Sequence, residues 1–280
     1  MDWLEKISKI KSWRRGDDYA PHKPLLLLLA LGALRQNKEL RWSEVNDKLS
    51  QLLRKYGGKS GLNPRPLYPF IRLQNDELWV VEGFIGISGD AKKSDLDRVN
   101  PIGYLEESFA DALSKNDKLF DEIVGALISQ FPETLIDDIL VDVQLSQVSR
   151  QFVRSKRDPK FRHEVLDAYD RACAICGNDI RVGDVTVGVE AAHIKPHAAD
   201  GPCEISNGIA LCLIHHKLFD RGAIGFNENM ELLISERVNG IASKSLVWAY
   251  DGQSANLPHK LSQKPDLKYL AWHQKNILQL

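Results

Sequence analysis

The sequence predicts an α+β protein with two domains, and three observations lead to this class. The chain has 280 residues, 43% hydrophobic and 27% charged, which is enough for two globular domains with separate cores. Apolar residues at helical spacing dominate its first half. Its second half has short β-branched runs and two cysteine-containing ligand pairs. Because the formal charge is −1, a surface for nucleic acid must be a local basic patch.

The first half is expected to open with two helices. Residues 2–14 predict a short basic helix. Pro24 suits a first helical position, and the leucines that follow it predict a buried helix. His22 and Lys23 enter that helix, and taken alone they are compatible with an ordinary exposed loop.

The next stretch predicts a strand, a helix, a loop and a hairpin. A strand-like L-R-W precedes a helix that Ser43 caps and that runs to Tyr56. Residues 57–61 predict a flexible loop that does not match a phosphate-binding motif. Within 67–81, I-R-L and L-W-V-V predict a hairpin that turns at Asn75-Asp76.

The rest of the first domain is expected to be a loop followed by helices. Gly89 to Ser94 predicts a polar loop that contains Lys92 and Lys93. The pattern from 102 to 145 is helical, and Pro132 ends one of these helices.

A polar, basic segment at 146–160 predicts the linker between a domain at 1–145 and a domain at 161–280. Such a linker either stays solvated or follows a phosphate backbone. Its cations are Arg150, Arg154, Lys156, Arg157 and Lys160. An amphipathic helix at 161–171 follows it, a strand is expected after Phe226, and a structural helix at 268–277 closes the chain.

Two short ligand pairs in the second domain predict a structural zinc site. Cys173 and Cys176 form C-x-x-C, and Cys212 and His215 form C-x-x-H. Two such pairs around a small insert direct four soft or borderline donors at one tetrahedral centre. The alternative is that these cysteines are simply small buried apolar groups. Three of the chain's four cysteines fall in this pattern, which argues against disulfides and for a reducing cytoplasm.

A second polar set lies between the zinc ligands. Residues 185–194 predict a strand that ends near His193, and Asn207 lies in the loop that follows. Residues 209–219 have the spacing of a short helix, and His216 lies on it.

These residues resemble the HNH nuclease family with its ββα-metal fold. The motifs A-H-I, S-N-G-I-A-L-C and H-H-K-L-F-D-R-G agree with it in order and spacing over about sixty residues. The resemblance implies that His193, Asn207 and His216 are catalytic. Histidine can deprotonate water near neutral pH, so His193 is the expected general base. Asn207 is expected to accept a hydrogen bond from its ring, and His216 to bind a catalytic divalent metal, Mg or Mn.

The sequence departs from that family at one position. Many HNH enzymes have Asp or His immediately before the base as a second metal ligand, and here that residue is Ala192. Glu190 lies on the same strand face and either replaces that ligand or is a solvated charge. His215 and His216 could exchange roles, but the C-x-x-H spacing favours His215 on zinc.

The first 145 residues resemble the sulfur-binding domain of restriction endonucleases that attack phosphorothioate-modified DNA. The motifs are P-H-K-P-L-L-L-L and Y-P-F-I-R-L-Q-N-D-E-L-W. The resemblance implies a double-stranded DNA partner with a phosphorothioate linkage, and a sulfur cavity formed by His22, Lys23, Tyr68 and Pro69. Sulfur is larger and more polarizable than oxygen, so proline and aromatic surfaces favour it. Lys23 stands where an arginine is also common.

Together the two resemblances imply a modification-dependent DNA endonuclease that acts in restriction and defence. Lys92 and Lys93 are the candidate base contacts. The alternatives are an HNH nuclease that reads a modified base, or a zinc-containing DNA-binding protein that does not cleave. No membrane role is expected, since the longest apolar run is too short to span a bilayer. One HNH centre cuts one strand, so a double-strand break would require a homodimer or two encounters.

Overall fold

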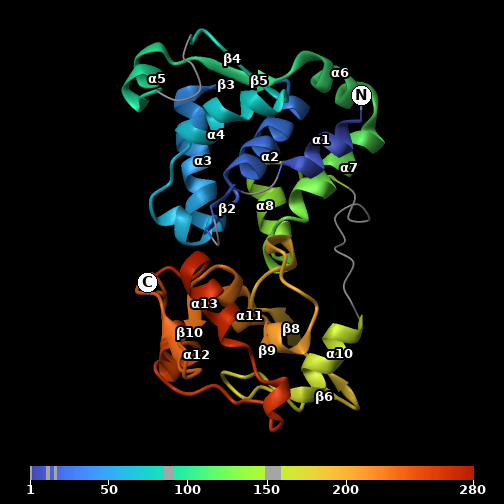
Figure 1. Ribbon diagram of the computed structural model, residues 1–280, viewed down its shortest axis with the longest axis vertical. Helices are drawn as coiled ribbons and strands as arrows, with labels where there is room; N and C mark the ends of the chain where they lie inside the picture. The colour runs from blue at the N-terminus through green and yellow to red at the C-terminus, as the bar shows by residue number, and fades with distance from the viewer. Residues whose placement is uncertain (1, 11–12, 16–17, 85–90, 149–158) are drawn as a thin grey trace. The chain divides into compact units, whose positions relative to one another are not determined.

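The computed structural model describes residues 2–10, 13–15, 18–84, 91–148 and 159–280. The chain divides into two compact units, Met1–Ser155 and Lys156–Leu280, each with its own hydrophobic core (Figure 1). This division falls within the predicted linker 146–160, and residues 149–158 of that linker lie outside the described residues. The domain bounds 1–145 and 161–280 therefore stay a prediction.

Unit 1 combines a group of helices with small antiparallel sheets, as the predicted α+β class requires. Its helices are α1 (Trp3–Lys9), α2 (His22–Arg35), α3 (Trp42–Tyr56), α4 (Leu67–Arg72), α5 (Lys93–Val99), α6 (Glu107–Lys115), α7 (Asp117–Ile128) and α8 (Ile136–Asp142). Its strands are β1 (Trp13–Arg15), β2 (Asp18–Ala20), β3 (Leu40–Arg41), β4 (Trp79–Glu82) and β5 (Ile102–Leu105). Strands β1 and β2 pair with each other, and the other three form a sheet in the order β3-β5-β4.

Helix α2 is the centre of this unit, as the run of leucines predicts. Its residues from Pro24 to Ala33 are all buried, so the helix is apolar on every side and must be surrounded by other elements. Helices α3, α4 and α7 contact it. Gly32 allows a close approach, because a Cβ atom there would lie 2.0 Å from the backbone oxygen of Val143.

The predicted hairpin within 67–81 is wrong in its first half. Helix α4 and a 3-10 turn, Leu73–Asp76, replace the first strand, and Glu77 ends that turn in a left-handed conformation with φ 55°. The alternation in I-R-L is too short to distinguish a strand from a helix whose apolar side is buried. Strand β4 forms as predicted but pairs with β5, far along the chain.

Four other local predictions for unit 1 need correction. The first helix ends at Lys9, and β1 occupies the end of the expected helix. Ser43 lies inside α3, where its backbone N–H donates to Asn100 Oδ1 at 2.9 Å, so it is not the cap. Gly58–Leu62 is a 3-10 helix whose glycines are buried, and thus no flexible loop. Ile102–Leu105 is a strand because its backbone pairs with β3 on one side and β4 on the other, while its side chains alternate between the two faces of the sheet.

The predicted loop from Gly89 to Ser94 is also only partly correct. Residues 85–90 lie outside the described residues. Lys93 begins α5, and Lys92 is its N-cap residue.

Unit 2 contains short antiparallel strand pairs and a few helices. Its helices are α10 (Pro159–Ala168), α11 (Leu213–Asp220), α12 (Ser243–Leu246) and α13 (Leu267–Asn276). Its strands are β6 (Arg181–Val182), β7 (Val185–Thr186), β8 (Val189–His193), β9 (Gly208–Cys212), β10 (Ile224–Phe226) and β11 (Leu232–Ile234). They pair as β6-β7, β8-β9 and β10-β11.

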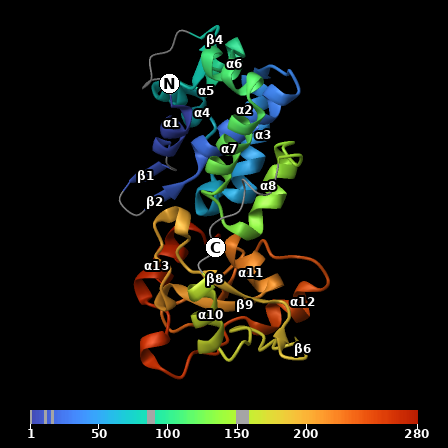
Figure 2. The same ribbon diagram turned by 90° about the vertical axis from the view of Figure 1, so that its right-hand side faces the viewer.

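The centre of unit 2 is a ββα arrangement made by β8, β9 and α11. Strands β8 and β9 pair antiparallel from Val189↔Cys212 to His193↔Gly208. Helix α11 follows β9 directly, so the expected helix at 209–219 begins only at Leu213; the fully buried G-I-A-L-C run is a strand. Helix α10 contacts both strands (Figure 2).

The closing helix α13 is structural, as predicted. Its Trp272 and His273 are buried, and the His273 ring stacks on Phe219 with centroids 3.8 Å apart. Burial lowers the pKa of His273 to about 4, although the Phe219 carbonyl opposes the shift. His273 is therefore neutral near pH 7 and belongs to the core.

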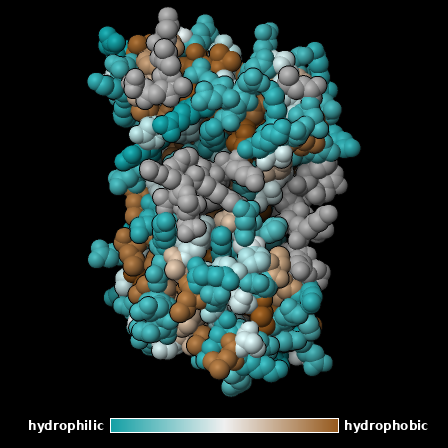
Figure 3. Space-filling model, in the orientation of Figure 1, coloured by the Kyte–Doolittle hydropathy of each residue, from teal (hydrophilic) through white to brown (hydrophobic). Residues whose placement is uncertain are grey.

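The molecular surface is consistent with these two cores. The face in Figure 3 is mostly hydrophilic, with hydrophobic residues in small separate areas. Among the described residues, no helix has the length and apolar character needed to cross a bilayer.

Candidate functional site

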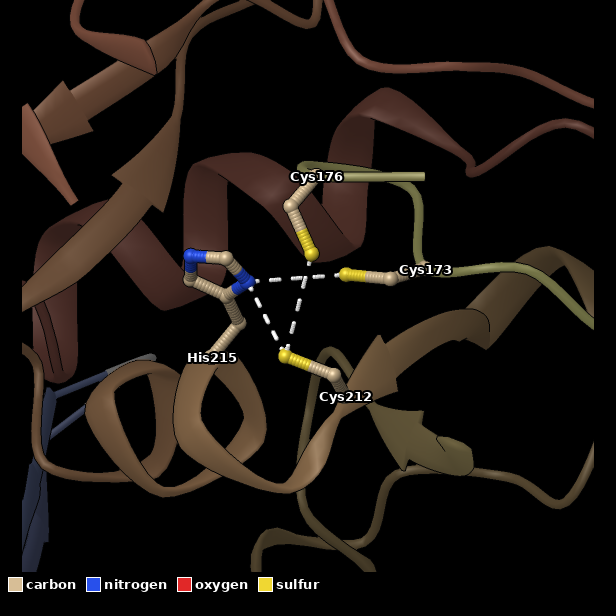
Figure 4. Close-up of side chains that lie close together, drawn as sticks. All are labelled: Cys173, Cys176, Cys212 and His215. Carbon is tan, nitrogen blue, oxygen red and sulfur yellow. Dashed lines mark hydrogen bonds between the residues drawn. The ribbon is translucent and has the colours of Figure 1, made fainter. Parts of the chain in front are cut away.

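The four predicted zinc ligands lie together in unit 2 (Figure 4). Their ligand atoms are all within 4.8 Å of one another. The Nδ1 atom of His215 is 3.5 Å from the Cys173 sulfur and 3.2 Å from the Cys212 sulfur, and the sulfurs of Cys176 and Cys212 are 4.0 Å apart. In a tetrahedral zinc site with bonds of about 2.0–2.3 Å, neighbouring ligands are roughly 3.5–3.8 Å apart. The four residues therefore fit a zinc ion.

Protonation also prepares this cluster for a metal. The Nε2 atom of His215 is 2.8 Å from the Leu246 carbonyl and donates its proton there, so Nδ1 is the ring nitrogen that faces the sulfurs and would bind a metal. Hydrogen bonds with Cys176 and Cys212 lower the pKa of Cys173 below its usual range. Burial alone would lower the pKa of His215, but its bonds to Cys173 and Cys212 prevail and raise it to about 10. These bonds favour a thiolate at Cys173, the form that binds metal, while hydrogen bonds with Cys173 and Cys212 raise the pKa of the Cys176 thiol.

His193 is the last residue of β8, where the predicted general base should be. Its ring stacks on Phe161 of α10, with centroids 4.0 Å apart and an interplanar angle of 14°. At the edge of the His193 ring, Nε2 lies 3.5 Å from the sulfur of the exposed Cys203. The ring is therefore held from two directions.

Asn207 does not hold the His193 ring, so the predicted hydrogen bond between them is wrong. Asn207 is fully buried, and its Oδ1 accepts from the Lys195 backbone N–H at 2.9 Å. Its Nδ2 donates to the carbonyls of Lys195 and Pro202, both at 2.9 Å. All its donors and acceptors therefore fix the loop after His193, and the residue acts on the base only through the backbone.

His216 lies on α11 between two carboxylates. Its Nδ1 is 2.9 Å from Oε2 of Glu190 on β8, and its Nε2 is 3.4 Å from Oδ2 of Asp220. Asp220 is nearly buried and follows His216 by one helical turn. The sequence prediction missed Asp220, although the H-x-x-x-D spacing on a helix was a usable signal.

This arrangement fits a divalent cation bound by Glu190 and His216. Neighbouring ligands of an octahedral ion with bonds of about 2.1 Å are about 3.0 Å apart, close to the distance between Glu190 and His216 Nδ1. In many metal sites a carboxylate accepts the N–H of the ring nitrogen that does not bind the metal, and this fixes the tautomer of the histidine. Asp220 lies in that position relative to His216. Glu190 is thus a better candidate ligand than a solvated charge, while Ala192 is fully buried and contributes none.

In unit 1, His22 is the first residue of α2 and not part of a loop. Its Nε2 atom is buried and has no hydrogen-bond partner among the described residues. Burial and then the nearby charge of Arg65 lower its pKa to about 4, so the ring is neutral near pH 7. Buried polar atoms usually have a hydrogen-bond partner, so a bound water, ion or ligand would complete this position.

Tyr68 and Pro69 lie on α4, which packs against α2. Pro69 is buried and Tyr68 is 39% exposed. Two arginines that the sequence prediction missed surround the tyrosine: the guanidinium carbons of Arg72 and Arg65 are 4.7 Å and 5.9 Å from its ring centroid.

Lys23 follows His22 in the first turn of α2 and is partly buried, and its place in the sulfur cavity stays a prediction. Its ammonium group forms an ion pair with Asp76, and both side chains are about three-quarters buried. The guanidinium groups that lie over the Tyr68 ring belong to Arg65 and Arg72.

Lys93 lines an open basic hollow of about 510 Å³ on unit 1. Its lining contains three cations and no carboxylate: Asn46, Ser50, Arg54, Asn63, Pro64, Arg65 and Lys93. Lys92 is exposed at the start of α5, and Lys93 is 2.9 Å from Asp97. Arg65 belongs both to this hollow and to the surroundings of Tyr68.

Comparison with known families agrees with both resemblances. Residues 1–148, more than half of the chain, match the family described as "ScoMcrA-like, DNA sulfur-binding domain". The chain belongs to this family. Residues 173–227 match the family "HNH endonuclease", so the chain is a nuclease in which an HNH domain follows the sulfur-binding domain. A domain of this kind uses a divalent metal, and the Cys₃His cluster could hold zinc.

Solved structures similar to the chain include two isolated sulfur-binding domains. The sulfur binding domain of SprMcrA complexed with phosphorothioated DNA is 26% identical, with 53% of this chain and 95% of that chain covered and a TM-score of 0.45. The corresponding domain of ScoMcrA is 25% identical, with 55% and 99% covered and a TM-score of 0.45. The Type IV phosphorothioation-dependent restriction endonuclease ScoMcrA is 24% identical, with 56% and 30% covered and a TM-score of 0.44. No match was found among curated proteins.

Proposed function

We propose that this chain is a restriction endonuclease that binds phosphorothioate-modified double-stranded DNA through its sulfur-binding domain and hydrolyses nearby phosphodiester bonds with its HNH domain. The observation that carries the proposal is the presence of both family matches in one chain. Retention of His193 and His216 argues against a module that only binds zinc, since neither is needed for the cluster.

In this proposal, sulfur is recognised by polarizable side chains that lie next to a positively charged surface. The neutral ring of His22, the Pro69 ring and the Tyr68 ring offer polarizable contacts to a sulfur that is a poor hydrogen-bond acceptor. Arg65 and Arg72 offset the remaining negative charge of the DNA backbone, and Lys23 stays a candidate cavity residue. Lys92 and Lys93 stay candidate DNA contacts.

Cleavage in this proposal uses His193 as the general base that takes a proton from the attacking water. Asn207 fixes the loop after the base, and Glu190 with His216 would hold Mg or Mn, whereas the Cys₃His cluster would hold structural zinc. When bound, the catalytic ion would offset charge on the phosphate and the leaving oxygen. A homodimer with one such centre per subunit would account for double-strand cleavage.

Tyr68→Ala should lower the affinity of the full chain for a duplex with one phosphorothioate, while its affinity for the unmodified duplex stays unchanged. The loss should be on the order of tenfold, or about 1.4 kcal/mol, because the variant removes contact with the soft atom only. Titration of both duplexes by fluorescence anisotropy measures the effect.

Tyr104→Ala is the matched control, because Tyr104 has 40% exposure against 39% for Tyr68 but lies on β5. It should bind both duplexes like the wild type. If the wild type bound modified and unmodified duplexes with equal affinity, the hypothesis of sulfur recognition would be contradicted. The hypothesis that the HNH domain cleaves DNA would be unaffected.

Arg54→Gln should weaken the binding of both duplexes equally and lower the salt slope of log K by about 1. Arg54 is exposed in the basic hollow, where we expect a phosphate of the same duplex. Lys55→Gln is a matched loss of charge at the next residue, and it should change little because Lys55 already pairs with Asp142 at 2.8 Å. Identical salt slopes for the two variants would exclude the hollow from the DNA interface.

A further inference from the structure

The His193 ring rests on an aromatic side chain that comes from outside the HNH match. Phe161 lies on α10, whereas the match begins at residue 173. The two rings are nearly parallel, with centroids 4.0 Å apart. Phe161 is only 4% exposed, so neighbouring core residues fix its own ring.

Gly208 makes this stacking possible. It is the residue opposite His193 on the neighbouring strand β9. A Cβ atom on Gly208 would lie 2.3 Å from Cγ2 of Val165 and 3.1 Å from the ring of Phe161. Phe161 and Val165 are one helical turn apart and face the same way, so glycine at 208 is what allows α10 to lie this close to the strands.

A third segment contacts the edge of the ring. The Cys203 sulfur lies 3.5 Å from Nε2 of His193. The second torsion of a histidine side chain has broad, roughly two-fold minima, so the ring of an unsupported histidine rotates readily. A flat contact on one face and a second contact on the edge restrict that rotation.

We propose that Phe161 is a positioning residue for the general base, and that Gly208 is required because it gives Phe161 access to the His193 ring. This inference rests on the proposed function of His193. Phe161 touches neither substrate nor metal in this account; it selects the ring orientation in which His193 meets the attacking water. Misplacement of a catalytic group by about 1 Å can cost about 100-fold in rate.

The kinetic test compares Phe161→Leu with Phe161→Tyr on the same DNA substrate. Leucine keeps an apolar side chain but no flat surface, so we expect kcat to fall by about 10- to 100-fold while KM stays near wild type. Tyrosine keeps the ring, and we expect it to recover most of kcat. If both variants lose the same activity, or if leucine loses none, the positioning role is wrong.

Gly208→Ala offers a second route to the same defect. The added methyl group should displace α10 and the Phe161 ring, and lower kcat about as much as Phe161→Leu. The double variant should lose little more than either single variant, because both changes remove one interaction. Fully additive losses would contradict the proposal.

A measurement without DNA and without the catalytic divalent ion, but with the structural metal retained, separates this inference from the proposed function. Stacking shifts the NMR resonances of the His193 ring protons through the ring current of Phe161, and Phe161→Leu should remove that shift. His273, stacked on Phe219 in the same unit, is the internal control and its resonances should not move. Unchanged His193 resonances would refute the stacking, whereas wild-type protein that cleaves no DNA would refute the function alone.

Discussion

His193→Ala is expected to reduce DNA cleavage by at least about 100-fold, because loss of a general base typically costs 10²- to 10⁴-fold in rate. His193 ends β8 and is not one of the four residues of the Cys₃His cluster, so metal content and DNA affinity should stay near wild type. The measurement is strand scission of a phosphorothioate-containing duplex with Mg²⁺ or Mn²⁺ present, alongside the affinity for that duplex.

His163→Ala is the control for this variant. His163 lies on α10 like Phe161, but its side chain is 68% exposed and pairs with Asp167 at the surface. It should cleave at the wild-type rate. Wild-type scission by His193→Ala would refute the assignment of the base.

Cys176→Ser and Cys212→Ser should each release the structural metal and unfold the region around residues 165–225. Metal binding supplies on the order of 10 kcal/mol of folding free energy in small zinc domains, and a serine hydroxyl does not replace a thiolate. Cys212 ends β9 in the core of unit 2 and Cys176 packs against that core, so loss of the metal should remove the ordered structure around them. Elemental analysis and thermal unfolding of the full chain report both effects.

Cys203→Ser carries the same chemical change outside the cluster, where the cysteine is exposed, and it should keep a full equivalent of zinc. If both cluster variants also kept a full equivalent, the proposed zinc site would be incorrect.

Local spacing made the cysteine–histidine cluster predictable, whereas tertiary contacts decided the rest of the candidate site. Ligand pairs two or three residues apart, such as Cys173 and Cys176, lie near each other in any compact fold. The role of Asn207 was not predictable in this way, because its partners are backbone groups of a loop whose path is unknown from sequence. Lys23 shows the same limit, since its partner Asp76 reaches it only after α2 and α4 pack.

The same contrast between local sequence and tertiary contacts applies to the predictions of secondary structure. The leucine run of α2 is long and apolar throughout, so its helix was clear from sequence. Short segments such as Ile71–Leu73 and Ile209–Cys212 are compatible with both a strand and one helical turn. Contacts with neighbouring elements decide which structure each segment adopts. The first segment belongs to a helical turn, and the second pairs with β8.

The contact between α10 and the two central strands also bears on where this nuclease could be divided and fused to other proteins. The first zinc ligand and the start of the HNH match coincide at Cys173, which makes that residue the obvious place to begin a transplanted cutting module. A module cut there would leave behind Phe161, Val165 and Leu166, all of which are buried in the core of unit 2. We therefore expect the smallest portable nuclease unit to begin at Pro159, so that it includes the helix that contacts the proposed base.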